Sequence, residues 1–271
     1  IPMLGLIIAF KDYSPANGIF ASQWVGFKYF TQFFSSFQFG TTMFNTLKIS
    51  LYSIVVGFPL PIILAIISNQ LRVGKFRKIF QVTTYLPHFI STMVMCGMII
   101  LFLSPTSGLL ANVFKSVGIT IPDLLSKPSH FAGVYVWSDV WQHIGWDSII
   151  YLAALSAIDP TYYEAATMDG ASRLQKIRHI ELPLLLPTAM ILLILRAGSL
   201  LSVGFEKVLL LQNPLNLAGS EIISTYVYKV GMVNFQYSYS TAIGLFNTVV
   251  NLIILLSVNW FSKRYTRTGL F

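Results

Sequence analysis

Long apolar runs separated by short polar segments dominate the hydrophobic pattern of the chain. A helix needs about 20 mostly apolar residues to cross the hydrocarbon core of a bilayer. The runs are continuously apolar and lack the alternation of barrel strands, so they predict membrane-spanning helices. Five full runs reach the required length, at residues 42–69, 84–103, 131–158, 184–211 and 239–261.

A shorter apolar segment, residues 1–10, opens the chain and is too short to cross a bilayer. It begins with isoleucine and shows neither the basic segment nor the small-residue cleavage site of a signal peptide. We therefore expect it to be the end of a first helix whose beginning is missing. Together with the full runs, it predicts an all-α integral membrane protein. The expected fold is a six-helix bundle that forms one transmembrane domain over residues 1–271.

The composition of the chain supports lipid as its surroundings. Hydrophobic residues make up 55% of its 271 residues and charged residues only 10%, whereas a soluble domain carries about 25% charged residues. This excludes a soluble enzyme and a disordered protein. The single cysteine, Cys96, excludes an internal disulfide framework and a multi-cysteine metal site. We expect no metal site.

Basic residues, 18 against 10 acidic ones, gather in alternate loops. Because short cytoplasmic loops are enriched in lysine and arginine, these loops indicate the cytoplasmic side. Six crossings then place both termini in the cytoplasm. The basic clusters are Arg72, Lys75, Arg77 and Lys78 in one loop, Arg173, Lys176 and Arg178 in another, and Lys263, Arg264 and Arg267 in the tail.

The loop at residues 159–183 is too long for a simple turn and too polar for a span. Asp159 is a good helix cap and Pro160 suits the first helical position. Gly170 accepts the backbone angles that end a helix, and residues 171–180 suit a second helix. The pattern predicts a helix–turn–helix at the membrane surface, with small alanines that allow another protein to approach closely.

Residues at fixed spacing in this loop carry a family resemblance. Glu164-Ala165-Ala166, Gly170, Ile180 and Leu182-Pro183 resemble the EAA loop of binding-protein-dependent ABC import permeases. Three further stretches resemble the polysaccharide and oligosaccharide branch of that family: residues 145–152, residues 204–214, and the ending Thr268-Gly269-Leu270-Phe271.

The resemblance implies the type I permease fold of ABC importers and a subunit of a bacterial cell membrane importer for oligo- or polysaccharide. Its partners would be a second permease subunit, often a different chain, two ATP-binding subunits and an extracytoplasmic substrate-binding protein. The sugar would move by alternating access. The implied ATPase-coupling residues are Glu164, Ala165, Ala166, Asp169, Gly170, Ala171 and Arg173.

The same resemblance implies that the chain is not itself an enzyme. ATP and magnesium would be bound by the partner subunits, and no cofactor is expected in this chain. The sequence agrees, because it has no G-x-x-x-x-G-K-[ST] phosphate-binding loop.

Ionisable side chains within an apolar run usually face the interior of a bundle or a water-filled cavity. Asp139, His143 and Asp147 are four residues apart, so they share one helical face. Polar groups beside indole rings suit sugars, which predicts a substrate path. An interfacial tryptophan belt with a structural hydrogen-bond network is the alternative interpretation. The tryptophans concerned are Trp137, Trp141 and Trp146.

Three other polar residues in the apolar runs are candidates for the path. Arg196 could pair with Asp147 or Asp139, or could meet an acidic sugar. We favour the internal pair, because an unpaired cation inside a membrane is unfavourable. Asn247 and Asn251 are four apart and could face the cavity or form hydrogen bonds between helices.

Other classes of membrane protein fit the sequence less well than a sugar permease. An embedded enzyme is disfavoured, since the trio Asp139, His143 and Asp147 in the run 131–158 lacks a nucleophile and no H-E-x-x-H pattern is present. A proton-coupled secondary transporter could use Asp139 or Asp147, but it needs no ATPase-docking loop. An importer of another polar solute also remains an alternative.

Overall fold

The computed structural model describes residues 2–71, 74–106, 108–116, 118, 122–266 and 269. Within these ranges the chain is mostly helical, and its short strands β1 (Lys11–Asp12) and β2 (Gln23–Trp24) pair antiparallel. Arg72, Arg267 and three residues of the expected family ending, Thr268, Leu270 and Phe271, lie outside the described residues. Ile1, the first residue of the expected partial helix, also lies outside them.

The chain divides into two compact units. The first comprises Ile1–Leu51, Thr92–Tyr135 and Gly198–Ile254, and the second Tyr52–Ser91, Val136–Ala197 and Leu255–Phe271. The division falls within three long helices, which are α3 (Phe37–Gly57), α8 (Pro128–Ser156) and α15 (Tyr237–Thr266).

The first unit has a core rich in aromatic rings. Phe33, Ile223, Val230, Tyr239 and Ile243 are buried together, and the ring of Phe33 meets that of Tyr239 edge-on at 6.5 Å. Besides its parts of the long helices, this unit contains the following short elements: η1 (Pro2–Phe10), α1 (Gly18–Ala21), α2 (Lys28–Phe34), α6 (Thr92–Leu103), α7 (Leu109–Ser116), α12 (Phe205–Leu211), α13 (Leu217–Ser220), α14 (Ile223–Tyr228) and η4 (Lys229–Val233).

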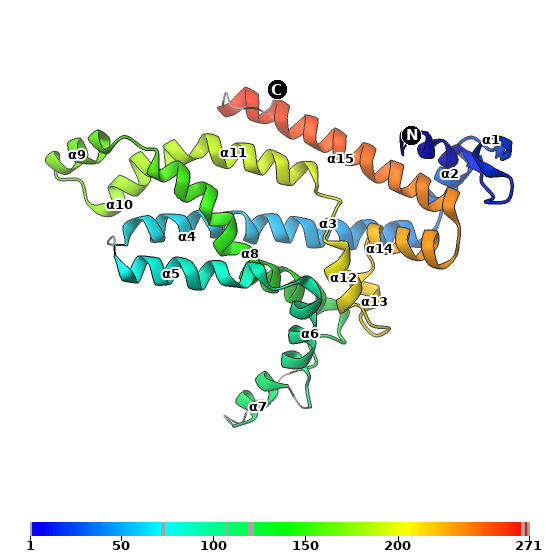
Figure 1. Ribbon diagram of the computed structural model, residues 1–271, viewed down its shortest axis with the longest axis horizontal. Helices are drawn as coiled ribbons and strands as arrows, with labels where there is room; N and C mark the ends of the chain where they lie inside the picture. Colours follow the sequence, from blue (N-terminus) through cyan, green and yellow to red (C-terminus); the bar gives the residue numbers. More distant parts are fainter. Residues whose placement is uncertain are drawn as a thin grey trace. The chain divides into compact units, whose positions relative to one another are not determined.

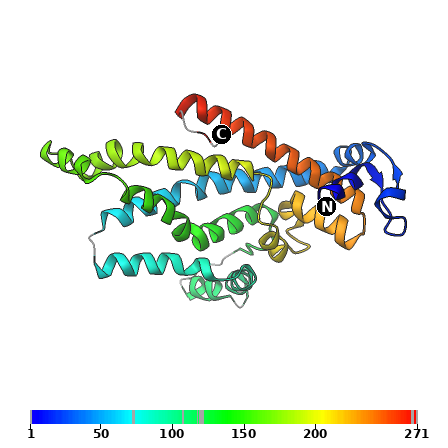
Figure 2. The ribbon, with the colours of Figure 1, turned by 45° about the horizontal axis from the view of Figure 1, so that its top comes forward.

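The second unit packs helices around an aliphatic core. Figures 1 and 2 both show α4, α8 and α11 side by side, with α9 and α10 at one end of them. The core consists of Ala65, Ile66, Tyr151, Leu155, Leu185 and Ala189. Its elements are α4 (Pro59–Gln70), α5 (Lys75–Tyr85), η2 (Leu86–Phe89), α9 (Pro160–Met168), α10 (Arg173–Lys176), the π-helix η3 (Ile177–Glu181) and α11 (Leu182–Gly198), with its parts of the long helices.

Gly145 brings α8 close to α5 in this unit. A Cβ atom at this position would lie 2.0 Å from the carbonyl oxygen of Thr84. Since no methyl group fits at that distance from a backbone atom, only glycine allows the two helices to approach this closely.

Three helical segments are long and apolar enough to cross a membrane: Phe37–Gln70, Arg173–Gly198 and Tyr237–Arg264. A fourth follows if Lys75–Phe89 and Thr92–Leu103 act as one span. The 29 residues of α8 are about 43 Å long, but polar side chains interrupt its apolar sequence. The count of six crossings stays a prediction.

The elements differ in detail from the expected apolar runs. The run at 42–69 is divided where α3 ends at Gly57 and α4 begins at Pro59, because proline cannot donate the next helical hydrogen bond. The run at 184–211 contains two helices, since α11 ends at Gly198 and α12 begins only at Phe205. Residues 2–10 form a 3₁₀ helix.

Candidate functional site

The loop at residues 159–183 forms the expected helix–turn–helix, hereafter the α9–α10 hairpin. Asp159 caps α9 by accepting a hydrogen bond from the Thr161 N–H at 2.9 Å. This bond stabilises the carboxylate and lowers the pKa of Asp159. Gly170 has φ +74°, in the left-handed region that glycine tolerates, and ends the helix as predicted. The Ala171 N–H closes the turn on the carbonyl of Ala166 at 2.9 Å.

A second set of contacts holds α10 against α9. The Ser172 hydroxyl accepts from the Gln175 N–H, and the Gln175 side chain accepts from the Ser172 N–H, forming a capping box. The Lys176 ammonium donates to the Thr167 hydroxyl at 2.7 Å. The helix starts at Arg173, two residues later than expected, and continues as the π-helix η3. These bonds order the hairpin before any partner arrives.

The outer surface of the hairpin offers small and apolar side chains. Glu164, Ala165, Asp169, Gly170 and Arg173 are exposed, while Ala166 and Ala171 are half-buried. Two large apolar residues that sequence reasoning missed join them: Met168 is 89% exposed and Leu174 is 73% exposed. Their apolar character in an otherwise polar loop could have identified them from the sequence. Exposed apolar patches rimmed by polar groups mark protein-binding surfaces.

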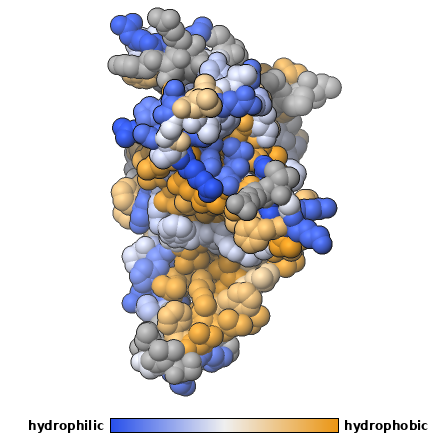
Figure 3. Space-filling view, turned by 90° about the vertical axis from the view of Figure 1, so that its left-hand side faces the viewer, coloured by the Kyte–Doolittle hydropathy of each residue, from blue (hydrophilic) through white to orange (hydrophobic). Residues whose placement is uncertain are grey.

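Figure 3 faces the end of the second unit that carries α9, α10 and the start of α5, where hydrophilic residues lie beside hydrophobic ones. The basic residues expected in these two loops include Lys75, Lys78 and Arg178, which are exposed. Because the exposed apolar side chains of the hairpin lie among polar ones, this end suits contact with a protein in water more than burial in lipid.

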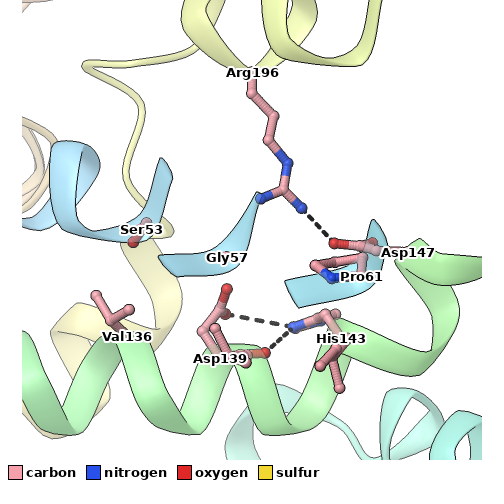
Figure 4. A pocket seen from close by; sticks show the side chains of 10 residues that line it. Ser53, Gly57, Pro61, Val136, Asp139, His143, Asp147 and Arg196 are labelled. Carbon is pink, nitrogen blue, oxygen red and sulfur yellow. Dashed lines mark hydrogen bonds and ion pairs between the residues drawn. The ribbon is translucent and has the colours of Figure 1, made fainter. Parts of the chain in front are cut away.

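The polar face of α8 opens onto a cavity of about 80 Å³ in the second unit, called here the α8 cavity. Asp139, His143 and Asp147 all line it, as their four-residue spacing predicted (Figure 4). The Nδ1 atom of His143 lies 3.4 Å from Asp139 Oδ1 and 3.0 Å from the Asp139 carbonyl oxygen. The other lining residues are Ser53, Gly57, Pro61, Val136, Val140, Ile144 and Arg196.

Arg196 of α11 reaches into the same cavity and forms an ion pair with Asp147 of α8. This confirms the internal pair that the sequence favoured over an acidic sugar. A Cβ atom on Gly57 would lie 3.3 Å from Arg196 Nη1, so the missing side chain of Gly57 leaves room for the guanidinium. The cavity therefore offers carboxylates, an imidazole and a guanidinium. The charge of the guanidinium is balanced by the carboxylate of Asp147.

The three candidate tryptophans are not among the residues that line the α8 cavity. The indole N–H of Trp137 donates to the Tyr52 hydroxyl at 2.8 Å. Trp146 stacks on His88, with ring centroids 4.4 Å apart, and sequence reasoning missed this role of His88. Trp141 is half-exposed. The helical face that carries Asp139 thus differs from the one that carries the indoles, and the expected sugar-stacking wall is separate from the polar cavity.

The two candidate asparagines lie in the first unit. The Asn251 carbonyl oxygen accepts from the Leu201 N–H at 2.9 Å, and its amide donates to the Ser202 hydroxyl at 3.1 Å. These bonds agree with the alternative interpretation from the sequence, a structural role, because they join helix α15 to the segment after α11. The Asn247 carbonyl oxygen is buried and has no hydrogen-bond partner among the described residues.

A second open groove, of about 590 Å³, lies along α3 in the first unit. Lys48, which is exposed in this groove, was not among the residues predicted from the sequence. A cation within the apolar run 42–69 could have indicated it. The amide of Asn45 is already used, because it donates to the carbonyls of Ala218 and Glu221, both at 3.0 Å. The groove is lined by Phe37, Gly40, Thr41, Phe44, Asn45, Lys48, Pro128, Ser129, Ala218 and Gly219.

Comparison with known families gives a match over most of the chain. Residues 57–267 match the family described as "Binding-protein-dependent transport system inner membrane component". The matched range includes the α9–α10 hairpin, α4, α11 and the polar face of α8.

Comparison with individual proteins extends the match to nearly the whole chain. It is 40% identical over 271 residues to Protein LplB of Bacillus subtilis (strain 168), covering 100% of this chain and 85% of that protein. It is 39% identical to the polygalacturonan/rhamnogalacturonan transport system permease protein YteP of the same organism, covering 100% and 84%.

A solved structure of a bacterial alginate ABC transporter, in complex with an alginate pentasaccharide-bound periplasmic protein, contains a similar chain. The TM-score is 0.92 at 41% sequence identity, over 99% of this chain and 90% of that one. The matches confirm the resemblance carried by the EAA pattern and the expected all-α permease fold.

Proposed function

Because the chain belongs to the family of binding-protein-dependent transport system inner membrane components, we propose that it imports oligo- or polysaccharide as one permease subunit of an ATP-driven transporter. The carrying observation is the EAA pattern, Glu164-Ala165-Ala166 to Gly170, on an ordered hairpin with exposed apolar side chains. The relatives support the cargo, since one is named for polygalacturonan and another comes from an alginate transporter.

The α9–α10 hairpin is the part of the chain that the ATPase subunits contact and move. In this proposal two separate ATP-binding subunits hold the ATP and magnesium, and the chain itself binds no nucleotide and is not an enzyme. The surface offered to them comprises Glu164, Ala165, Asp169, Gly170 and Arg173, which are exposed. The bonds that order the turn support this role, because a preordered surface loses less conformational entropy on binding.

Transport proceeds by alternating access. ATP binding closes the pair of ATPase subunits, and the hairpin passes this motion to the membrane helices. The permease pair then opens toward an extracytoplasmic binding protein and accepts the sugar, and hydrolysis restores the inward-facing state. Substrate moves only if its affinity for the two states differs. The second permease subunit of the pair is proposed to be a different chain.

The α8 cavity supplies polar groups for the path. Asp139 and His143 can accept from and donate to sugar hydroxyls, while Arg196 stays with Asp147. A cavity of this kind orients a polar ligand through a few placed groups. The indoles of Trp137, Trp141 and Trp146, which lie outside that cavity, are proposed to contact sugar on the remainder of the path. Asn247 and Asn251 are proposed to support the helices beside it.

We also propose the orientation in the bacterial cell membrane. The basic residues Lys75, Lys78, Arg173 and Arg178 support a cytoplasmic position for the α4–α5 loop and the hairpin. Six crossings then place both termini on that side.

Purification of the chain with its natural partners tests the function. Mass spectrometry of the isolated complex is expected to identify two copies of an ATP-binding subunit, a second permease and a bound glycan. ATP hydrolysis by this complex is expected to rise when its binding protein is added with the glycan. Recovery of the chain without ATP-binding subunits would contradict an ATP-driven importer. A bound amino acid or metal chelate in place of a glycan would contradict only the cargo.

A further inference from the structure

Glu181 is a charged residue type in a fully buried position. Its side chain is 0% exposed, and it ends the π-helix η3, directly after α10. Short π-helical turns often occur at functional sites. Burial of a carboxyl group is unfavourable unless the group is hydrogen-bonded. The bonds that Glu181 makes therefore identify its role.

All the side-chain hydrogen bonds that Glu181 makes with described residues converge on one oxygen. Oε1 accepts from the Gln70 amide at 2.7 Å, the Asn69 amide at 3.3 Å and the Tyr163 hydroxyl at 3.4 Å. Oε2 is buried and has no partner among the described residues. The three donors come from two segments that are far apart in the sequence, so a single atom joins them.

One of these segments is the coupling hairpin. Tyr163 lies on α9 beside Glu164 but faces another way, since Tyr163 is half-buried while Glu164 and Ala165 are exposed. Burial, together with the neighbouring Glu181, raises the pKa of Tyr163. The phenol thus stays protonated and donates its hydrogen bond. A force applied to the outer face of α9 reaches Glu181 through Tyr163.

The other segment is the end of a candidate membrane span. Asn69 and Gln70 are the last two residues of α4, which closes the segment Phe37–Gln70. One residue earlier, the Ser68 hydroxyl accepts from the Gln81 amide of α5 at 3.1 Å. The end of α4 is therefore held on one side by α5 and on the other by Glu181.

We propose that Glu181 is a positioning residue that makes the end of α4 move with the coupling hairpin when the ATPase subunits close. This inference rests on the proposed function, because it needs an external motor acting on α9. Removing a carboxyl used only for stability would lower the thermal unfolding of the complex, because its donors would lack an acceptor, but α4 would still respond to nucleotide. Removing a carboxyl that transmits motion would reduce that response as well.

This difference defines the variants. Glu181→Leu keeps the volume and removes every acceptor, Glu181→Gln keeps one acceptor oxygen, and Tyr163→Phe removes only the donor from the hairpin. Tyr237→Phe is the matched control. Tyr237 is also half-buried, lies in the other unit and makes no hydrogen bond through its hydroxyl to a described residue.

The readout is a spin label on α4 at Ile67→Cys, a position 47% exposed, in the full complex with its ATPase subunits. Cys96 stays in place because it is buried. The spectrum is recorded with and without ATP plus vanadate. Copurification of the ATPase subunits and the thermal unfolding of the complex are measured beside it.

We expect the nucleotide-induced spectral change to fall about fivefold in Tyr163→Phe, the factor for one lost hydrogen bond, and at least as far in Glu181→Leu, which removes that bond and two others. Glu181→Gln and Tyr237→Phe should respond like the wild type. The combination Glu181→Leu with Tyr163→Phe should be no worse than Glu181→Leu alone, because the link is already broken. Tyr163→Phe should change thermal unfolding and copurification little, whereas Glu181→Leu should lower thermal unfolding because it leaves buried donors without an acceptor.

Wild-type responses in both Glu181→Leu and Tyr163→Phe would overturn the inference. An equally reduced response in Glu181→Gln would also overturn it. That variant keeps an acceptor oxygen, so the lost response could not be due to lost hydrogen bonds. A wild-type complex that contains the ATPase subunits but shows no response at α4 would overturn the link alone. A chain that purifies without those subunits would overturn the proposed function, and the link with it.

Discussion

Arg196 of α11 donates a hydrogen bond to the carboxylate of Asp147 of α8, and the two charges face each other across the α8 cavity. Both side chains are about one third exposed to that cavity. The pair ties α11 to the helix that carries the polar face, and it engages the Arg196 guanidinium within the chain.

Breaking this pair should weaken both fold and transport. We expect Arg196→Ala to destabilise the complex by about 1–2 kcal/mol, less than for a fully buried pair because the cavity screens the charges. The exchanged variant, with Arg196→Asp and Asp147→Arg, should recover part of the loss. Thermal unfolding and uptake are the measurements, and exposed Arg178→Ala is the control. No recovery in the exchanged variant would argue for a different partner.

The turn of the hairpin depends on the backbone conformation of Gly170. A Cβ there would meet no atom within 4 Å, so Gly170→Val acts only through its positive φ. The left-handed conformation costs a β-branched residue about 1–2 kcal/mol, which should loosen the docking surface. We expect normal expression but loss of substrate-stimulated ATP hydrolysis. Gly133→Ala, which also has open space but an ordinary φ, is the control. Full stimulation in Gly170→Val would contradict docking through this turn.

Glu164→Lys examines the charge on the same surface. Glu164 is exposed and its side chain makes no ion pair with a described residue. The reversal should therefore leave the chain's own stability within about 0.5 kcal/mol. We expect copurification with the ATPase subunits to fall. Unchanged copurification together with unchanged stimulated hydrolysis would remove Glu164 from the interface.

Close contact between α8 and α5 makes Gly145 sensitive to the smallest substitution. Gly145→Ala would place a methyl group 2.0 Å from the Thr84 carbonyl oxygen, and neither backbone can yield cheaply. We expect a loss of about 1–3 kcal/mol, measured by thermal unfolding against Gly133→Ala. A stable Gly145→Ala variant would mean that α8 and α5 are farther apart in the membrane.

Uptake kinetics can show which face of α8 lines the substrate path. Asp139→Asn removes a charge from the α8 cavity, whereas Trp141→Phe shortens a half-exposed ring outside it. If the cavity is the path, Asp139→Asn should lower uptake about tenfold, the loss expected when a hydrogen bond to a charged group is removed, with assembly intact. Trp141→Phe should have a smaller effect. The reverse order would place the path along the indoles.

Tyr29 provides a pH-dependent contact outside the candidate spans. Burial, followed by its hydrogen bond to Asp12, raises the pKa of Tyr29 to about 12 from its usual 10.0. Because the folded-state pKa is the higher one, the stabilisation is complete below pH 10 and is lost as pH rises toward 12. The tyrosinate absorbance of Tyr29→Phe should show one late-titrating group fewer than that of the wild type. An unchanged titration curve in Tyr29→Phe would contradict the contact between Tyr29 and Asp12.

The main features of the hairpin and of the polar face could be predicted from local sequence. Asp159, Pro160 and Gly170 set the ends of α9 through their own backbone and capping preferences. The four-residue spacing of Asp139, His143 and Asp147 put them on one helical face, and all three line the α8 cavity. Helix geometry alone suffices for such predictions, because neighbours in the chain define them.

Other parts depended on contacts between distant segments. Trp137 and Trp141 are two residues from Asp139, so helix geometry already places their indoles on another face of α8, but the partner of Trp137, Tyr52 of α3, is set by packing. Pairing of Arg196 with Asp147 was one of several options until α11 and α8 were placed together.

The sequence by itself determined the apolar helices, the ordered hairpin and the family to which they belong, since periodicity, capping and fixed motif spacing are properties of adjacent residues. Only the tertiary structure decided which carboxylate holds Arg196 and that Glu181 joins Tyr163 to the end of α4. These relationships link residues 18 to 112 positions apart. Packing brings such residues together, and no local pattern encodes the distance between them.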